Sequence, residues 1–308
     1  MKNKIVLINP GNRKEVFQGL GSEYAAIETP YWCVTIAAYL RSQNYDPIII
    51  DSDVENLSFI DTANRVKDID PVLCVLIVHG STPQQSTMNM DDANGISNTI
   101  KNNSNVTLAI SGLHPTALPE RTLKESQADY VIIGEGPLTI KMIAEYENNL
   151  IEKKGILSVL HYENRKIVRT KKAELFQDMD EMMPIGAWDL VPIEKYRCHY
   201  WHTYKDLSKR SPYASIYTSL GCQYNCSFCQ VNTLFGKPGI RFRNPEIVVE
   251  ELEMLNKKYN VQNAASGQLG GCTGRRLGEL GSFLQGRKFT KRSETAQKQR
   301  TARNQPQN

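Results

Sequence analysis

The chain has 308 residues, of which 40% are hydrophobic and 23% are charged, so it exceeds the roughly 100 to 200 residues of one domain and can bury ordinary cores. No stretch approaches the ~20 apolar residues of a membrane helix. Four consecutive apolar residues precede Asn9, too few for the apolar part of a signal peptide. We therefore expect a cytoplasmic protein of two domains without a membrane span.

The net charge of +4 is distributed unevenly along the chain. Residues 263–308 hold nine Lys or Arg and two acidic residues, whereas the preceding 262 residues hold 28 and 31. A basic end can bind the phosphates of nucleic acid. This one is also rich in glycine and poor in β-branched residues, which is typical of a disordered segment. We expect a solvated tail and no nucleic-acid partner.

Short apolar runs in the first 150 residues predict five strands, at 4–8, 47–51, 72–78, 106–110 and 130–134. The runs show little polar alternation, which is typical of strands covered on both faces of a parallel sheet. Helices are predicted between and after them, at 31–43, 59–69, 90–103, 119–127 and 137–150. In the first helix, Trp32, Ile36, Tyr39 and Leu40 share one face. The alternation predicts a doubly wound α/β domain over residues 1–150.

Polar and glycine-containing loops follow four of these strands. They contain "NPG" after the first strand, "HGSTPQQ" after the third, "SGLHPTALP" after the fourth and "GEGP" after the fifth. Each loop alone is compatible with ordinary turn chemistry. Ligands of a doubly wound domain bind beyond the carboxyl ends of its strands, so four such loops on one edge predict a ligand site.

Residues 151–212 are predicted to connect this domain to a second one. A hairpin is expected at 156–170, and Trp188 is expected to be buried. The second domain begins near Tyr213 with a strand at 214–219. A helix at 244–259 follows, with Asn244 suited to cap it.

Three cysteines, Cys222, Cys226 and Cys229, lie between that strand and helix. Thiols remain reduced in the cytosol, so clustered ones bind metal more often than they form disulfides. Zinc ligands usually come as two separated pairs; Cys198, His199 and His202 are the nearest residues that could complete a zinc site. Ferredoxin-type runs supply a fourth cysteine. A triplet alone would leave one iron of a cluster without a protein ligand.

The stretch "SIYTSLGCQYNCSFCQ" resembles the signature of radical S-adenosylmethionine (SAM) enzymes, and "FRNPEIVVEELEML" resembles their first barrel helix. The resemblance implies that the three cysteines hold a 4Fe-4S cluster whose fourth iron binds SAM, with Gly221 and Phe228 next to SAM. It implies reductive cleavage of SAM to a 5'-deoxyadenosyl radical. It also implies a β/α partial barrel, of which residues 213–262 would be the first part.

Three further segments, "GLHPTALPERTL", "DYVIIGEGPLTI" and "GAWDLVPIEKY", resemble the cobalamin-dependent branch of that superfamily. The resemblance implies a flavodoxin- or Rossmann-like cobalamin-binding domain at residues 1–150. The implied cobalamin contacts are Pro10, Ser81, Thr82, Gly112, His114, Pro115, Thr116, Gly134, Glu135 and Gly136. Other cobalamin domains ligate cobalt through an Asp-x-His-x-x-Gly segment, which this sequence lacks, since His79 has no Asp two residues before it. The resemblance therefore implies cobalamin without a histidine on cobalt.

The function implied by the resemblance is methyl transfer to an unactivated carbon. The substrate would be a small molecule of natural-product or lipid type, and the electron donor a flavodoxin or ferredoxin. One alternative is an RNA methylthiotransferase, but those enzymes have three further cluster cysteines in the first domain, where this chain has Cys33 and Cys74. Another is a non-catalytic cobalamin- or metal-binding module. The resemblance ends near Val261, so we expect a chain truncated early in the barrel, with an inactive fragment as one outcome.

Overall fold

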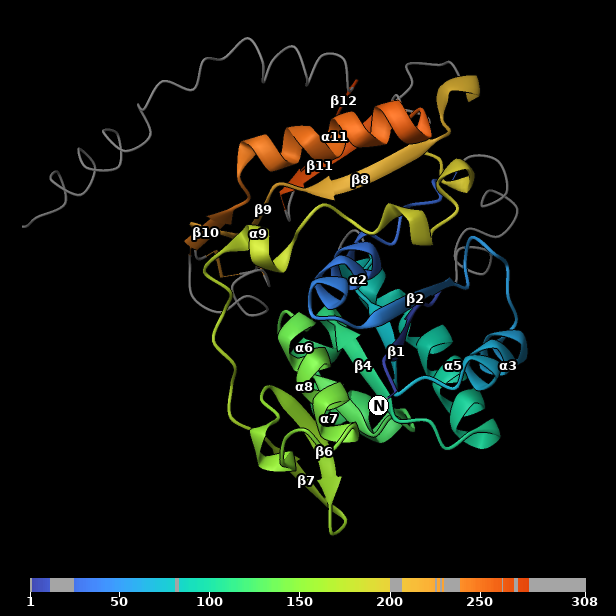
Figure 1. Cartoon of the computed structure of the whole chain (residues 1–308), viewed down its shortest axis with the longest axis vertical. Coiled ribbons are helices and arrows are strands. Elements are labelled where there is room, and N and C mark those ends of the chain that lie inside the picture. Colours follow the sequence, from blue (N-terminus) through green and yellow to red (C-terminus); the bar gives the residue numbers. More distant parts are fainter. Residues whose placement is uncertain are drawn as a thin grey trace, which may run out of the picture.

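The computed structural model describes residues 2–11, 25–80, 83–199, 207–224, 226, 227, 229, 239–261, 263–268 and 271–276. A seven-stranded sheet with its helices forms the lower part of the molecule in Figure 1, and a smaller set of strands beside one long helix forms the upper part. Within these residue ranges, no helix has the length and apolar character needed to cross a membrane.

The large sheet has the strand order β2-β1-β3-β4-β5-β6-β7. Its parallel strands are β1 (Lys4–Asn9), β2 (Asp46–Asp51), β3 (Leu73–Val78), β4 (Leu108–Gly112) and β5 (Tyr130–Ile132). These are the five strands that the apolar runs predicted. The order reverses between β1 and β3, which makes the carboxyl ends of those two strands the switch point of the sheet.

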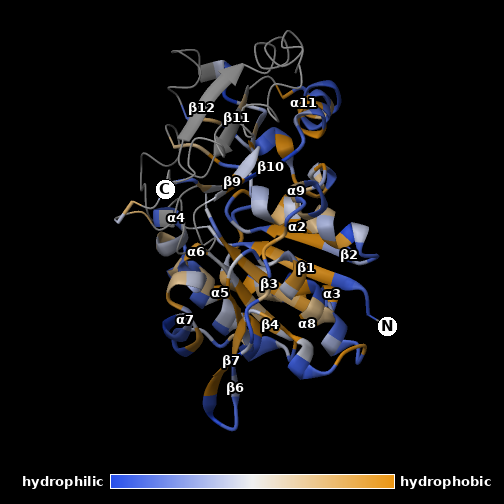
Figure 2. Cartoon of the chain, turned by 90° about the vertical axis from the view of Figure 1, so that its left-hand side faces the viewer, coloured by the Kyte–Doolittle hydropathy of each residue, from blue (hydrophilic) through white to orange (hydrophobic). Residues whose placement is uncertain are grey.

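Helices cover both faces of this sheet. On one face lie α2 (Tyr31–Ser42) and α8 (Pro137–Glu147), and on the other lie α3 (Phe59–Ile69) and α5 (Met90–Asn103). Neighbouring residues of β1 alternate between the two cores, because successive side chains of a strand point to opposite faces. Figure 2 shows the hydrophobic residues concentrated along the central strands. The predicted doubly wound α/β fold is confirmed.

Three short helices lie in loops on the carboxyl side of the strands: α4 (Pro83–Met88), α6 (Leu113–Ala117) and α7 (Pro119–Glu125). Of these, the sequence predicted α7 alone. The turn signals of the other two loops come from Pro, Ser and Gly, which also occupy helix starts, so the local pattern does not distinguish a loop from a short helix.

Helix α2 differs from its prediction as a helix with one apolar face. Every residue from Tyr31 to Leu40 is buried. The sheet covers one side of the helix, and the connector covers the other, since Met182 and Trp188 lie in the same core. Helix α2 is therefore a central helix between the sheet and the second part of the molecule.

The hairpin predicted in the connector consists of β6 (Val159–Glu163) and β7 (Lys166–Arg169), joined by Asn164 and Arg165 with positive φ angles of 48° and 63°. Two such residues form the turn that matches the twist of a hairpin. Strand β6 pairs antiparallel with β5. The sheet of the first domain thus extends beyond residue 150 into the connector.

Within the described residues, the rest of the connector contains five single helical turns: η1 (Lys153–Gly155), α9 (Met179–Met182), η2 (Trp188–Leu190), η3 (Ile193–Lys195) and η5 (Leu207–Lys209). Of these, α9 and η2 pack against α2. Trp188 is 1% exposed, which confirms its predicted burial.

The second part begins with β8 (Tyr213–Tyr217), which α11 (Pro245–Tyr259) connects to the parallel strand β11 (Asn263–Gln268). Strand β12 (Gly271–Arg276) pairs antiparallel with β11, and β9 (Ser219–Cys222) pairs antiparallel with β10 (Gly239–Phe242). The side chain of Asn244 accepts a hydrogen bond from the Glu246 N–H at 3.0 Å, as expected of its predicted capping role. Strand, helix and parallel strand form a βαβ unit.

The predicted disorder of residues 263–308 is wrong for β11 and β12. The composition of this segment is poor in large apolar side chains, but β11 is held by backbone pairing to β8, in which Ala264 lies opposite Ala214. Large apolar side chains are not needed at this position for burial, because Ala264 is only 2% exposed. Residues 277–308 lie outside the described part of the chain.

Candidate functional site

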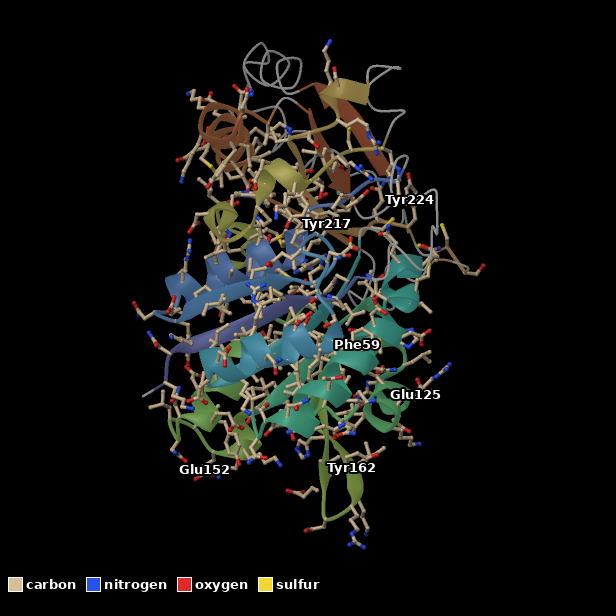
Figure 3. The ribbon with its side chains drawn as sticks, turned by 90° about the vertical axis from the view of Figure 1, so that its right-hand side faces the viewer. Phe59, Glu125, Glu152, Tyr162, Tyr217 and Tyr224 are labelled. Atoms are coloured by element: carbon tan, nitrogen blue, oxygen red, sulfur yellow. The ribbon has the colours of Figure 1, made fainter. Side chains whose placement is uncertain are left out.

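A cavity of about 370 Å³ lies at the carboxyl ends of β1 and β3, the switch point of the large sheet. Both parts of the molecule form its walls, because Ser215 and Tyr217 of β8 face it from the second part. Figure 3 labels Tyr217 at this junction. From the first part come Asn9, Pro10, Gly11, Ala26, Glu28, Thr29, Pro30, Tyr31, Trp32, Cys33, Asp53, Ile77, His79, Gly80, Gln85, Met88 and Asn89. The cavity lies on the edge where the loop pattern predicted a ligand site.

One wall of the cavity is a series of aromatic rings. The ring centroid of Tyr217 lies 5.3 Å from that of Tyr31 and 6.0 Å from that of Trp32. Trp32 in turn stacks on His79, with centroids 4.2 Å apart and an interplanar angle of 20°. These rings are rigid and bring much apolar surface at low entropic cost. The wall therefore offers a ligand rigid apolar surface.

His79 is a buried histidine without a hydrogen-bond partner among the described residues. It follows the last residue of β3 and is 2% exposed, and neither Nδ1 nor Nε2 is paired. Burial lowers its pKa to about 3, so the imidazole is neutral at physiological pH. His79 was not among the predicted cobalamin contacts, because no Asp stands two residues before it. Its place directly after a strand on the ligand edge was the signal that could have identified it.

Two hydrogen bonds connect the two sides of the cavity. The Ser215 N–H donates to Thr29 Oγ1 at 3.0 Å, and the hydroxyl oxygens of the same residues lie 2.8 Å apart. Thr29 precedes α2, whereas Ser215 lies in the middle of β8. Strand β8 is thus attached to the first domain at the cavity itself.

Asp51 is a buried carboxylate behind the wall of the cavity. It accepts hydrogen bonds from Asn9 Nδ2 at 2.9 Å and from the Tyr196 hydroxyl at 2.8 Å. Burial nevertheless raises its pKa to about 6. Burial, and secondly the charge of Asp51, also raise the pKa of the neighbouring Cys33 thiol well above its usual value. Cys33 therefore lines the cavity as a protonated thiol.

The raised pKa of Asp51 predicts a pH-dependent stability. The folded protein binds the proton of Asp51 more tightly than the unfolded chain does. Its contribution to the free energy of unfolding is therefore fully present below the ordinary pKa of 3.8 and is lost as pH rises through about 6. We expect wild type to lose about 2 kcal/mol between these pH values relative to Asp51→Asn. Urea unfolding of both proteins at several pH values measures this difference, in which groups that titrate equally in both proteins cancel. A difference independent of pH would contradict the assignment.

The residues predicted to contact cobalamin do not all lie in this cavity. Pro10 lines it, whereas Ser81 and Thr82 lie outside the described residues. Thr116 and Gly134 instead line a second cavity, of about 1030 Å³, beside α7 and β7. In that place the Gly134 N–H donates to Thr116 Oγ1 at 3.0 Å.

His114 and Glu135 are engaged in contacts within the protein. The His114 N–H donates to Ser86 Oγ at 2.9 Å, and its Nδ1 lies 3.1 Å from Thr87 Oγ1. These contacts attach α6 to α4. The buried carboxylate of Glu135 forms an ion pair with Arg241 of β10. Glu135 thus connects the first domain to the strand pair that carries Cys222.

The remaining predicted contacts, Gly112, Pro115 and Gly136, shape the ends of β4 and β5. A methyl carbon at Gly112 would lie 2.1 Å from the carbonyl oxygen of Val78, so the close approach of the ends of β3 and β4 requires glycine. Pro115 is buried within α6, and Gly136 begins α8 with a φ angle of 97°.

The cysteine triplet starts at the end of β9. Cys222 and Cys229 pack at the border of the large core, Cys226 is exposed, and the Cys229 N–H donates to the Cys226 carbonyl oxygen at 3.0 Å. Phe228 lies outside the described residues. Among the residues that the structure describes, no three His, Cys, Asp or Glu side chains are gathered closely enough to hold a metal ion. Three accessible thiols on a short loop are nevertheless the soft donor set that an iron-sulfur cluster requires.

The other residues considered for a zinc site do not join the triplet in the described part of the chain. Cys198 lies in the hydrophobic core, where burial raises the pKa of its thiol. His199 Nε2 lies 3.7 Å from Glu28 Oε1. His202 lies outside the described residues. A buried, protonated thiol is a poor metal ligand.

A buried ion pair holds α11 against the first domain. Arg243 Nη1 lies 2.7 Å from Glu251 Oε2, and both side chains are 0% exposed. The other carboxylate oxygen of Glu251 accepts hydrogen bonds from the Gly186 N–H at 2.9 Å and from Trp188 Nε1–H at 2.8 Å. Arg243 Nη1 also donates to the Tyr31 hydroxyl oxygen at 3.0 Å. This network joins α2, the connector and α11 directly beside the aromatic wall.

Comparison with known proteins agrees with this architecture. Residues 18–144 match the family described as B12 binding domain. An uncharacterized methyltransferase of Pyrococcus horikoshii is 32% identical over 261 residues, which are 84% of this chain and 52% of that protein.

Two solved structures share the fold at 16% identity. One is the cobalamin-dependent SAM radical enzyme OxsB with aqua-cobalamin and SAM bound (TM-score 0.65, covering 87% of this chain and 34% of that one). The other is the radical SAM methyltransferase TsrM from Kitasatospora setae with cobalamin and a 4Fe-4S cluster bound (TM-score 0.63, covering 87% and 48%).

The chain spans about half the length of the Pyrococcus relative and less of the two solved chains. The similarity nevertheless extends over both parts of the molecule, because 84% of this chain aligns with that relative. Residues 18–144 match the B12 binding domain, and β8, the cysteine triplet and α11 follow it, so the chain is similar to radical SAM proteins that carry a cobalamin-binding domain.

Proposed function

We propose that this chain binds a 4Fe-4S cluster, SAM and cobalamin and that it serves radical methyl transfer to a small molecule. One observation carries the proposal. Strand β8 lines the cavity at the switch point of the B12-binding domain, and the next strand along the chain ends at Cys222. Residues 215–222 thus connect one wall of the cavity to the first proposed cluster ligand, which supports two adjacent cofactor sites.

The residues of the two sites fit these groups. The thiols of Cys222, Cys226 and Cys229 are the proposed cluster ligands, with Gly221 and Phe228 beside SAM. The cavity offers cobalamin an aromatic wall that includes Trp32 and Tyr217. When bound, the reduced cluster and SAM supply a 5'-deoxyadenosyl radical, and cobalamin supplies a carrier for a methyl group.

The protein itself positions these groups and excludes water. The rings of Trp32 and Tyr217, which are tilted to each other by 44°, close one side of the cavity with apolar surface. The Thr29–Ser215 hydrogen bonds hold β8 over the cavity. Radical chemistry requires such exclusion of solvent to avoid side reactions. The positions of these elements therefore support a reaction between the two cofactor sites.

The partners follow from this chemistry. We propose a flavodoxin or ferredoxin as the electron donor, and a small-molecule substrate of natural-product or lipid type. Reduced thiols at the cluster site favour the cytoplasm as the compartment. An RNA methylthiotransferase is disfavoured, because Cys33 and Cys74 are both buried with their pKa raised by burial, which is unsuited to cluster ligands.

Metal analysis after anaerobic reconstitution tests the proposal. The chain is purified without oxygen, supplied with iron, sulfide and cobalamin, and assayed for iron, sulfide, cobalt and zinc. We expect iron, sulfide and cobalt to be bound, and Cys226→Ala to lose most of the iron while Cys272→Ala retains it. Formation of 5'-deoxyadenosine from SAM by the reconstituted protein would show the radical reaction. Zinc in place of iron would overturn the proposal, and cobalt without iron would leave a cobalamin-binding module.

A further inference from the structure

The second cavity, of about 1030 Å³ beside α7 and β7, differs in charge from the cavity at the switch point. The described wall of the switch-point cavity contains Glu28 and Asp53 and no Lys or Arg. The wall of the second cavity carries four cations and two acids: Arg121, Lys124, Arg169 and Lys172 with Glu120 and Glu125. Residues 1–262 as a whole hold more acids than cations. The second cavity is therefore the one whose charge favours an anionic ligand.

Three of the four cations lack a counter-charge in the described part of the chain. Arg121 pairs with Glu125, with Nε 2.7 Å from Oε1. The side chains of Lys124, Arg169 and Lys172 are exposed, and none of them forms an ion pair with a described residue. Cations that line one cavity repel one another, and a bound anion would offset that repulsion.

The fold brings Lys124 and Arg169 to this cavity from two different elements. Leu123 of α7 packs on β5 and β6 in a small separate core, and Lys124 is the next residue of the helix. Ile167 of β7 packs against the same core. Alternate residues of a strand share a face, so Arg169, two residues after Ile167, lies on the face of β7 that α7 covers.

Lys172 is held at the cavity by backbone pairing on both sides of it. The Ser158 N–H donates to the Lys171 carbonyl oxygen at 2.8 Å, and the Ala173 N–H donates to Ser158 Oγ at 2.7 Å. Ser158 is buried and lines the cavity. The segment after β7 is thus attached next to the start of β6, which fixes the position of the third cation.

The remaining wall offers apolar surface and an open backbone. Leu118 is 43% exposed, and Ile133 lines the cavity with it. A methyl carbon on Gly134 would meet no atom within 4 Å, so a ligand can approach this backbone closely. Thr116 Oγ1 accepts from the Gly134 N–H at 3.0 Å, and its hydroxyl can donate its own proton. The wall can therefore contact both an anionic group and an apolar body.

We propose that the second cavity binds an organic phosphate. Lys124, Arg169 and Lys172 hold the phosphate group, and the apolar part of the ligand lies on Leu118 and Ile133. A phosphate monoester carries between about 1.5 and 2 negative charges at neutral pH, which suits three cations better than a single carboxylate does. A cavity of this volume has room for both parts of such a ligand. The site goes beyond the proposed function and does not depend on its cofactors.

Calorimetric titration of the 308-residue chain, supplied with cobalamin, tests the proposal with phenyl phosphate as the probe. We expect phenyl phosphate to bind about tenfold more tightly than inorganic phosphate, because its ring is removed from water. Benzyl alcohol, which lacks the charge, should not bind. Changing Lys124, Arg169 and Lys172 together to Gln should weaken binding by about tenfold, and Lys172→Gln alone by about threefold. The single change lies outside helices and strands, so it does not depend on how the triple variant folds.

The matched control changes Arg165, Lys166 and Lys171 to Gln. These three side chains are also exposed on the β6–β7 hairpin and the segment after it, and they do not line the cavity. The control removes the same charge and should leave phenyl phosphate binding unchanged. Equal weakening by both triple variants would show attraction to the overall charge and would overturn the proposal.

Two further arms identify the source of the phosphate and separate it from cobalamin. Vesicles of phosphatidylcholine with phosphatidic acid should sediment the chain if the phosphate belongs to a lipid, and a soluble ligand leaves it in solution while phenyl phosphate binds. Binding to neither overturns the proposal. Thr116 and Gly134 were predicted cobalamin contacts, so competition between cobalamin and phenyl phosphate is measured as well. Displacement of one by the other would assign the cavity to cobalamin, which overturns the proposal and leaves the proposed function intact.

Discussion

Replacing Glu251 with Gln should lower the free energy of unfolding by about 3 kcal/mol, because it leaves the guanidinium of Arg243 buried without its opposite charge. Both side chains are fully buried and lie 2.7 Å apart. A glutamine oxygen can still accept the hydrogen bonds from Gly186 and Trp188, so the change removes mainly the charge. Equilibrium unfolding in urea measures the loss.

A surface pair and a double variant provide the controls. Glu125 pairs with Arg121 one helical turn away at 2.7 Å, and Figure 3 labels Glu125 on the outside of the molecule. Glu125→Gln should cost at most about 0.5 kcal/mol. Combining Glu251→Gln with Arg243→Met removes both buried charges, and we expect it to restore more than half of the lost stability. Equal costs for Glu251→Gln and Glu125→Gln would show that the buried pair does not hold α11 in place.

The Glu251→Gln change should also weaken the packing of the aromatic wall of the cavity. Arg243 donates to the Tyr31 hydroxyl oxygen, and the Tyr31 ring packs on Tyr217 in the aromatic wall. Loss of the network should loosen the contact between β8 and α2. We therefore expect weaker cobalamin binding by the Glu251→Gln protein, although Glu251 is not a wall residue of the cavity.

Replacing Gly221 with Ala should cost about 2 kcal/mol or more of stability and most of the iron content. Gly221 has a φ angle of +93°, and a methyl carbon there would lie 2.3 Å from the Gly239 carbonyl oxygen. In β9 and β10, Gly221 pairs with Ile240 and Cys222 pairs with Gly239. The added methyl group must separate the two strands, which displaces Cys222. Thermal unfolding and iron per folded chain are the two measurements.

Gly134→Ala separates backbone strain from this steric contact. Gly134 has nearly the same φ angle, +91°, but a methyl carbon on it would meet no atom within 4 Å. The Gly134→Ala change should lower the free energy of unfolding by about 1 kcal/mol, because alanine is strained at this positive φ angle. The iron content should be unchanged. If the two variants lose equal stability and equal iron, the close approach of β9 and β10 does not position Cys222.

Local sequence patterns were sufficient for much of the framework. The five parallel strands, their helices and the cap at Asn244 follow from hydrophobic periodicity and from residues that act within one turn. The cysteine triplet is likewise a local feature, because its spacing lies on one short loop. Polar loops after buried strands correctly predicted the edge of the sheet that carries the cavity.

Contacts between segments that are distant in the sequence could not be predicted from local sequence patterns. Glu135 was expected to contact a cofactor, and the structure pairs it with Arg241, which is remote in the chain. Strand β11 forms because β8 offers it a backbone edge, a condition that the composition of residues 263–308 does not contain. His79 follows β3, and its ring stacks on Trp32, which comes from α2.

Hydrophobic periodicity and cysteine spacing are properties of neighbouring residues, so the amino-acid order alone specifies the B12-binding sheet and the three thiols. The cavity between β1, β3 and β8, the Arg243–Glu251 pair and the orphaned imidazole of His79 depend on how the two parts of the molecule pack. Burial and desolvation arise when those parts meet, and they set the charge state of His79 and Asp51. The tertiary structure therefore decides which residues line the cavity.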